Sequence, residues 1–472
     1  MKILLTGVTG YIGKRMLPEL LAAGHEVVCC VRDLQRFDVS KYTQQRIKVI
    51  EINFLAPESL KVIPDDIDVA YYLIHSMSAS TRHFEDLEKQ SAINFRERLN
   101  QTRVQQVIYL SGIVNDEKLS KHLLSRKMVE EILSHGRYAL TTLRAGIIIG
   151  SGGASFEIIR DLVEKLPVMI APKWLNTRSQ PIAVSNVIDY LRGVMMRPDT
   201  YGQSYDIGGP EILTYRDMLL KLAEVQGLKR VIITVPVMTP RLSSYWLYFV
   251  TSTSYKLAVN LVNSMKVEVI CHDQRLQQML QVKLISYAEA VKLAYQKISQ
   301  SVVPSSWKDA LSEPALEKGL IHLLPIPEEN CFKDRRVLTL KNVPVTVERI
   351  WTIGGRKGWY YGQWLWSIRG FLDQMIGGVG LRRGRRDENE LVAGDALDFW
   401  RVIYANKDER RLLLYAEMKL PGEAWLEFKI SGQVLYQTAT FKPKGIWGKI
   451  YWYSVWPFHQ IIFRGLINKL GK

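Results

Sequence analysis

Three glycines, at positions 7, 10 and 13, stand between an apolar run and an amphipathic segment at the start of the chain. The run Lys2–Thr6 has the composition of a buried strand, and Gly13–Ala23 has helical periodicity. A turn built from glycines lets the backbone approach a pyrophosphate, and the helix that follows offers free N–H groups and a partial positive charge. Because a second strand, Glu26–Val31, comes next, the sequence predicts a dinucleotide-binding strand–turn–helix unit.

The predicted helix after the turn has one apolar face. Its apolar residues recur at spacings of three and four, and they are Met16, Leu17, Leu20 and Leu21. We expect a bound dinucleotide to contact the residues of the turn itself, which are Gly7, Thr9, Gly10, Tyr11, Ile12 and Gly13. The alternative is a glycine-rich turn that only packs the strand against the helix.

Strand and helix patterns alternate through the first 300 residues. Short apolar runs predict strands at Lys2–Thr6, Glu26–Val31, Ile47–Ile52, Val69–Ile74, Gln106–Ser111 and Leu140–Leu143. Segments with helical periodicity lie between them, at Gly13–Ala23, Thr81–Asn100 and Lys121–His135. This alternation predicts an α/β fold, a Rossmann doubly wound parallel sheet with helices on both faces.

The composition changes after residue 330. Apolar residues make up 47% of the chain and charged residues 23%, which excludes a mainly disordered protein. Of the net charge of +16, the residues from Cys331 to the end carry +11, and they also hold nine of the 12 tryptophans. Prolines and serines gather in the stretch 301–330, which indicates a linker.

We therefore expect three parts in the chain. Residues 1–300 form an NAD(P)-binding Rossmann domain with a small substrate-side subdomain, 301–330 form the linker, and 331–472 form an α+β domain. In the last part, strand-like segments follow one another with short breaks, at Arg411–Met418, Ala424–Ile430 and Val434–Phe441.

The end of the second predicted strand indicates which dinucleotide binds. An acidic residue there hydrogen-bonds the ribose hydroxyls of NAD, whereas an arginine pairs with the 2′-phosphate of NADP. Arg32 occupies this position and Asp33 follows it, so NADP(H) is favoured and NAD(H) is the alternative. Asn53, after the third strand, is placed either to meet the adenine or to form a turn.

Short motifs extend through the first 300 residues in order. They are TGVTGYIG (6–13), VRD (31–33), AYYLIHSM (70–77), VIYLSGI (107–113), LRAGIIIGSG (143–152), QPIAVSNVIDYL (180–191) and YDIGGPEILTY (205–215). With these motifs the segment resembles the atypical branch of the short-chain dehydrogenase/reductase superfamily, in particular the NmrA-like proteins and the Rossmann accessory subunit of respiratory complex I.

The resemblance implies a catalytic pattern from which this chain departs. Such reductases use a Ser after the fifth strand and a Tyr-x-x-x-Lys pair on the next helix. Ser111 stands at the Ser position, but His122 falls at the Tyr position and Arg126 at the Lys position. His122 can still donate a proton, and Arg126 can still hold ribose and phosphates; the alternative is a helix surface without chemistry. The loop with His75 implies a further cofactor contact, and a packed histidine is its alternative.

The last third resembles a START/polyketide-cyclase helix-grip domain. That resemblance implies an apolar cavity and a hydrophobic small-molecule ligand. Four arginines, Arg382, Arg383, Arg385 and Arg386, are expected either to bind an anion or to form a solvated loop. The aromatic and basic segment 445–472 is either the long helix of the fold or a contact with an anionic lipid surface.

The sequence also bears on location and on other partners. No segment has about 18 uncharged apolar residues, so a membrane-spanning helix is not expected. The few cysteines have no metal-binding spacing, which excludes a metal site and favours a reducing, cytoplasmic setting, with peripheral contact at the inner membrane face as an option. No recognised nucleic-acid module accompanies the basic stretches, so no nucleic acid is expected.

Three functions from different classes are compatible with these patterns. The favoured one is an NADP(H)-dependent oxidoreductase that acts on a hydrophobic carbonyl or quinone-like substrate. The second is an NADPH-binding sensor or scaffold without turnover, which the missing Tyr-x-x-x-Lys pair favours. The third is a lipid-binding protein at the membrane surface.

Overall fold

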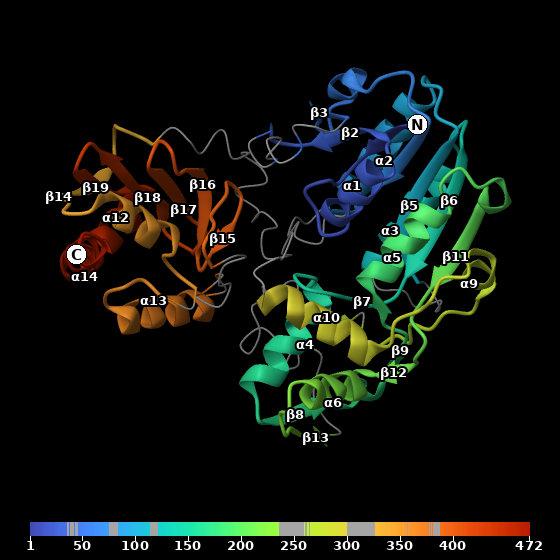
Figure 1. Ribbon diagram of the computed structural model, residues 1–472. Helices are drawn as coiled ribbons and strands as arrows, with labels where there is room; N and C mark the ends of the chain where they lie inside the picture. The colour runs from blue at the N-terminus through green and yellow to red at the C-terminus, as the bar shows by residue number, and fades with distance from the viewer. Residues whose placement is uncertain are drawn as a thin grey trace. The chain divides into compact units, whose positions relative to one another are not determined.

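The computed structural model describes most of the chain (Figure 1). The described residues are 1–34, 37, 42, 46–74, 84–113, 121–235, 259, 262–263, 265–299, 326–355, 357–376, 378, 380 and 388–472. They form two compact units, one built from the residues up to Ser299 and one from the residues after Pro325. The predicted linker falls almost entirely outside the described residues and stays a prediction.

A seven-stranded parallel sheet forms the centre of the first unit, in the order β11-β6-β5-β4-β1-β2-β3. The strand order reverses beside β1, which is the arrangement of a doubly wound sheet. The predicted α/β class is therefore confirmed, with strand ends that shift by a few residues. The strands are β1 (Lys2–Leu5), β2 (Glu26–Val31), β3 (Ile47–Glu51), β4 (Val69–Tyr72), β5 (Gln106–Gly112), β6 (Ala139–Ala145) and β11 (Gln203–Ile207).

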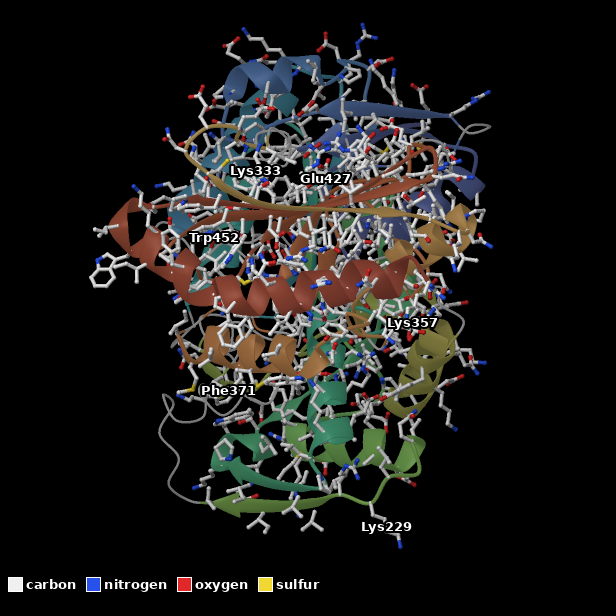
Figure 2. All side chains as sticks on the ribbon, turned by 90° about the vertical axis from the view of Figure 1, so that its left-hand side faces the viewer. Lys229, Lys333, Lys357, Phe371, Glu427 and Trp452 are labelled. Atoms are coloured by element: carbon white, nitrogen blue, oxygen red, sulfur yellow. The ribbon has the colours of Figure 1, made fainter. Side chains whose placement is uncertain are left out.

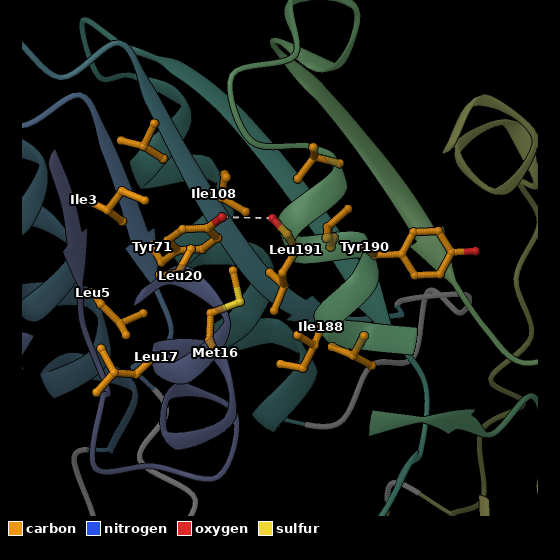
Figure 3. Close-up of a cluster of buried hydrophobic side chains, with 14 of the residues drawn as sticks. Ile3, Leu5, Met16, Leu17, Leu20, Tyr71, Ile108, Ile188, Tyr190 and Leu191 are labelled. Carbon is orange, nitrogen blue, oxygen red and sulfur yellow. Dashed lines mark hydrogen bonds between the residues drawn. The ribbon is translucent and has the colours of Figure 1, made fainter. Parts of the chain in front are cut away.

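Helices cover both faces of this sheet. One face is packed by α1 (Gly13–Ala22) and α5 (Val184–Gly193), and the other by α2 (Phe84–Leu99) and α3 (Lys121–Ser134). Figure 3 shows the first of these layers, where the hydroxyl of Tyr71 donates to the carbonyl of Leu191 at 2.9 Å. All four apolar positions predicted for the first helix are buried there, because they form its one core-facing stripe.

A smaller part of the first unit has its own core beyond the carboxyl ends of the sheet strands. Helices α4 (Ala154–Lys165), α6 (Tyr215–Val225) and α10 (Tyr287–Ser299) enclose it. Short strand pairs complete it, and α9 (Arg275–Leu280) packs by β11. The paired strands are β7 (Ile148–Ile149) with β10 (Ile182–Ala183), β8 (Val168–Pro172) with β13 (Val231–Val235), and β9 (Arg178–Ser179) with β12 (Leu213–Thr214).

The second unit contains a six-stranded antiparallel sheet, in the order β14-β19-β18-β17-β16-β15, and its described residues also form three helices. The long helix α14 (Gly445–Leu470) packs on β14 and β19 and runs through Pro457. An α+β arrangement was predicted for this part, and the helix-grip identity stays a prediction. The other elements are α12 (Val343–Trp351), α13 (Gln363–Met375), β14 (Phe332–Thr339), β15 (Ala396–Leu397), β16 (Trp400–Asn406), β17 (Arg411–Ala416), β18 (Gly422–Ser431) and β19 (Val434–Pro443).

A buried ion pair holds two neighbouring strands of the second unit together. Arg401 on β16 binds Glu417, which follows β17, through two hydrogen bonds of 3.0 Å, and both side chains are fully buried. The guanidinium also donates to the carbonyl of Gly394 at 2.7 Å. A buried charge that loses its partner is expensive, so removal of either side chain leaves the other in an unfavourable state.

We predict that Arg401→Met lowers the free energy of unfolding of the second unit by about 3–5 kcal/mol, because the buried carboxylate of Glu417 loses the guanidinium that binds it through two hydrogen bonds. Unfolding in urea followed by tryptophan fluorescence measures this, since most tryptophans lie in that unit. The matched control is Lys407→Ala, which removes the exposed pair with Glu348 and is expected to cost less than about 1 kcal/mol. Equal losses of stability in the two variants would contradict the conclusion that the buried Arg401–Glu417 pair stabilises the second unit.

Candidate functional site

The glycine turn after β1 is closed so tightly that its geometry excludes side chains. Gly7 has a φ of +65°, and its carbonyl accepts from the N–H of Gly10 at 2.8 Å. A Cβ atom on Gly13 would lie 2.2 Å from the carbonyl oxygen of Gly7, and a Cβ atom on Gly7 would lie 2.6 Å from that of Leu73. Glycine is therefore required at both positions for steric reasons.

The turn presents free backbone donors at the amino terminus of α1. No side chain caps this helix, and within the described part of the chain the N–H groups of Tyr11, Ile12 and Gly13 have no acceptor. Unpaired N–H groups at a helix amino terminus, together with the helix dipole, favour an anion. The residues present therefore fit the pyrophosphate of a dinucleotide.

The side chain of Tyr11 is buried inside the unit and is not available to bind a pyrophosphate. Burial raises the pKa of its phenol to about 12, and the guanidinium of Arg15 lies 4.1 Å from its ring centre. Arg15 also donates to the carbonyls of Tyr11 at 2.8 Å and of Ser151 at 2.6 Å. Gly150 and Gly153 leave room for the ring, since a Cβ atom at either would lie within about 3 Å of the hydroxyl. The backbone of Tyr11, not its phenol, is thus available for a cofactor.

Arg15 is a residue that the sequence analysis did not single out. It connects the turn to the loop before α4, and so joins the nucleotide side of the unit to its smaller part. The sequence feature that could have indicated Arg15 is its position in the first turn of α1, close to where a phosphate would bind.

Arg32 follows β2, the strand next to β1, and so lies at the same edge of the sheet as the turn. Its side chain is exposed, and no hydrogen bond or ion pair holds it within the described residues, whereas Asp33 is buried. Asn53 forms a turn, in which its Oδ1 accepts from the N–H of Leu55 at 3.1 Å. The turn alternative for Asn53 is therefore observed, and its contact with adenine stays a prediction.

Two predicted catalytic residues place buried polar atoms in the region of β5 and α3. Ser111, at the end of β5, has a buried Oγ that interacts with the phenol of Tyr109. Arg126, on α3, has a buried Nε without a hydrogen-bond partner in the described structure. The hydroxyl of Tyr109 donates to the carbonyl of Arg126 at 3.4 Å. Burial raises the pKa of this phenol to about 12, and the Arg126 cation opposes that shift.

His122 lies in the first turn of α3, but its side chain is outside the described residues. It stands four positions before Arg126, so both residues share a face of the helix. His75 and the arginines at 382–386 also lie outside the described residues, and their roles remain predictions.

Two side-chain contacts that the sequence did not reveal anchor α3 beside the site. The buried Ser125 donates to the carboxylate of Glu88 on α2. Farther along α3, Glu130 pairs with Arg144 of β6 at 2.6 Å. The arginine of the LRAG motif therefore holds α3 against β6. These contacts fix the helix that carries His122 and Arg126.

The described residues contain no group of His, Cys, Asp or Glu side chains that is arranged to hold a metal ion. The described helices include none long and apolar enough to cross a membrane. In the second unit, an open cleft of about 910 Å³ lies beside α12, and its lining includes Glu348, Arg349 and Lys407. Apolar side chains such as Val343 and Val345 also line this cleft, and it is open to solvent, unlike the enclosed cavity that the helix-grip resemblance implies.

Two family models match the chain. Residues 7–158 match a family described as NAD(P)H-binding, and residues 327–466 match one described as a protein of unknown function, DUF2867. The first match includes the glycine turn, so the part of the first unit with the Rossmann-like sheet is similar to NAD(P)H-binding domains. No curated protein matches the sequence.

Solved structures of reductases and an epimerase share the fold of the first unit. Triphenylmethane reductase of Citrobacter sp. is 18% identical with a TM-score of 0.52, over 63% of this chain and 100% of that chain. A nucleoside-diphosphate-sugar epimerase of Staphylococcus aureus is 15% identical with a TM-score of 0.51, over 62% and 100%. The NADPH-dependent quinone oxidoreductase of Escherichia coli, complexed with NADPH, is 15% identical with a TM-score of 0.50, over 62% and 99%.

We predict that Gly13→Ala weakens NAD(P)H binding by at least about tenfold, because its Cβ atom displaces the carbonyl of Gly7 and opens the turn. Calorimetry with NADPH measures the loss. The control is Ala22→Gly on the exposed side of the same helix, which costs about 1 kcal/mol of helix stability and leaves the turn intact. Unchanged affinity in Gly13→Ala would show that the turn does not hold the cofactor.

Proposed function

We propose that the first unit is an NADP(H)-dependent reductase that acts on a hydrophobic carbonyl or quinone-like substrate. The proposal rests on two features at one edge of the sheet: the backbone amides of the glycine turn at the amino terminus of α1 and the exposed Arg32, neither of which has a hydrogen-bond partner among the described residues. Two reductases have the same fold: one reduces triphenylmethane dyes and the other reduces quinones with NADPH.

The preference for NADP(H) over NAD(H) rests on the charge at the end of β2. The 2′-phosphate of NADP carries negative charge, and a guanidinium binds phosphate through charge-assisted hydrogen bonds. Arg32 has the exposure that this contact needs, while the neighbouring carboxylate, Asp33, is buried.

The proposed chemistry uses three residues of β5 and α3. When bound, the nicotinamide supplies a hydride to the carbonyl carbon and is oxidised. His122 donates the proton to the carbonyl oxygen, Ser111 donates a hydrogen bond to the same oxygen, and Arg126 binds the ribose or phosphates. The Nε of Arg126 supports its role, because it is buried without a hydrogen-bond partner among the described residues, and such an atom is costly unless a ligand satisfies it.

The first test concerns the cofactor. Arg32→Asp is expected to weaken NADPH binding by about 10–100-fold and to affect NADH much less, because one charge-assisted contact becomes a repulsion. Titration with both nucleotides measures the ratio of affinities. Arg103→Asp is the control, since it makes the same charge change at an exposed position before β5, at the opposite edge of the sheet. If Arg32→Asp weakens both nucleotides equally, the proposed phosphate contact is wrong.

The second test concerns turnover. NADPH oxidation is followed with a panel of quinones and aromatic ketones, and His122→Ala is expected to lower kcat by about 10²–10⁴-fold, the usual contribution of a proton donor. NADPH affinity should stay unchanged. The matched control is His135→Ala, which removes an exposed histidine just beyond the far end of α3 and should leave kcat unaffected.

A specific observation favours a second function, an NADPH-binding sensor or scaffold. The Tyr and Lys of the superfamily pattern are replaced by His122 and Arg126, and an arginine does not act as an acid at neutral pH. Tight NADPH binding without substrate-dependent oxidation across the whole panel would reject the reductase and leave this function in its place.

A further inference from the structure

Helix α14 is apolar on two sides, although only one side packs against its own sheet. Its inner side includes Trp452, Phe463 and Leu466, which are buried. His459 lies between two rings on that side, 5.1 Å from Trp452 and 4.9 Å from Phe463, and burial lowers its pKa to about 4. The inner side of α14 is therefore part of the core of the second unit. This packing does not explain why the opposite side of the helix is also apolar.

The outer side of the same helix carries large apolar and aromatic side chains. Trp447 is 73% exposed and Ile446 is 69% exposed. The other exposed members of this side are Ile450, Tyr453, Phe458 and Ile461. A surface helix normally presents polar residues to water, so a helix apolar on both sides needs a second apolar environment.

Helix α13 extends this surface. Its own exposed apolar residues include Trp364, Ile368, Phe371 and Met375. The two helices touch, because the rings of Trp366 and Phe463 lie 6.2 Å apart. Figure 2 shows the two helices side by side, with Phe371 and Trp452 toward the same end. We call the exposed apolar residues of the two helices the α13–α14 face.

The loop after β17 forms hydrogen bonds with residues at the adjacent ends of both helices. The loop after β17 donates from the backbone N–H of Lys419 to Asp373 of α13 at 2.7 Å. Its Pro421 accepts from the N–H of Lys444, just before α14, at 2.9 Å. The two exposed sets are therefore held in one piece of structure, so they can meet a single surface together.

The exposed charges in and just before α14 have one sign. In residues 417–472 every exposed charged side chain is a lysine or an arginine, and Lys419, Lys444 and Lys449 stand near the start of α14. The acidic side chain in α13, Asp373, is buried and accepts from backbone N–H groups. Exposed tryptophan and tyrosine with a cationic border are complementary to the headgroup region of an anionic bilayer.

We infer that the α13–α14 face docks on the surface of a membrane that contains anionic lipids, with α14 lying in the interface. The described helices include none that could span a bilayer, so the contact is peripheral. A second copy of this chain is a less suitable occupant, because the chain carries a net charge of +16 and would bring further positive charge to the lysines.

The experiment is flotation of the full-length protein with vesicles. Vesicles of phosphatidylcholine with one third phosphatidylglycerol should carry the protein, and phosphatidylcholine alone should carry much less. The double variant Trp447→Ser/Ile450→Ser is expected to lower the bound fraction on anionic vesicles by at least about tenfold, because two exposed apolar anchors are lost. Lys444→Ala/Lys449→Ala should weaken binding by about fivefold for each charge, on anionic vesicles only.

The matched control is Val231→Ser/Ile233→Ser, which removes two apolar side chains of similar exposure on β13 of the first unit and should leave flotation unchanged. Stability and oligomeric state of every variant are measured without lipid. Equal flotation of wild type and Trp447→Ser/Ile450→Ser would overturn the inference. A change of oligomeric state in that variant would assign the face to a second copy, and a loss of folding stability would assign it to another part of this chain.

Discussion

The closure of the turn after β1 is the constraint on which the site depends. The carbonyl of Gly7 lies where Cβ atoms at Gly13 would stand, and Leu73 closes the turn from β4, so the chain can pass this point only without side chains. The same closure brings the amino terminus of α1 to the sheet edge, where its first N–H groups have no acceptor among the described residues. The absence of Cβ atoms at Gly7 and Gly13 therefore has two consequences: the turn accepts no side chain at these positions, and its backbone N–H groups are accessible to an anion.

The rest of the site is arranged around that turn by contacts between distant parts of the chain. Arg15 joins the turn to the loop before α4, while Glu88 and Arg144 hold α3 from two sides. These polar contacts are partly or fully buried, where a hydrogen bond to a charged group is worth more than at the surface. They set the position of α3 before any ligand binds, as a preorganised site requires.

The second unit combines a closed interior with an apolar exterior. Inside, the Arg401–Glu417 pair and a packed group of aromatic rings fix the sheet and its helices. Outside, the α13–α14 face leaves tryptophan and isoleucine in water. The same residue types, tryptophan and phenylalanine among them, therefore pack the core on one side of α14 and stay exposed on the other side. Only the side of the helix on which a residue lies distinguishes core packing from a surface contact.

The sequence by itself determined the α/β order of the first unit, the glycine turn and three strands of the second unit, β17, β18 and β19, because these follow from local periodicity and from the special backbone of glycine. It also placed Ser111 and Arg126 on neighbouring elements. Only the tertiary structure decided that Tyr11 turns inward, that Arg144 pairs with Glu130 and that one side of α14 stays exposed. Those outcomes depend on which residues distant in sequence meet, and the pattern along a single segment does not contain that information.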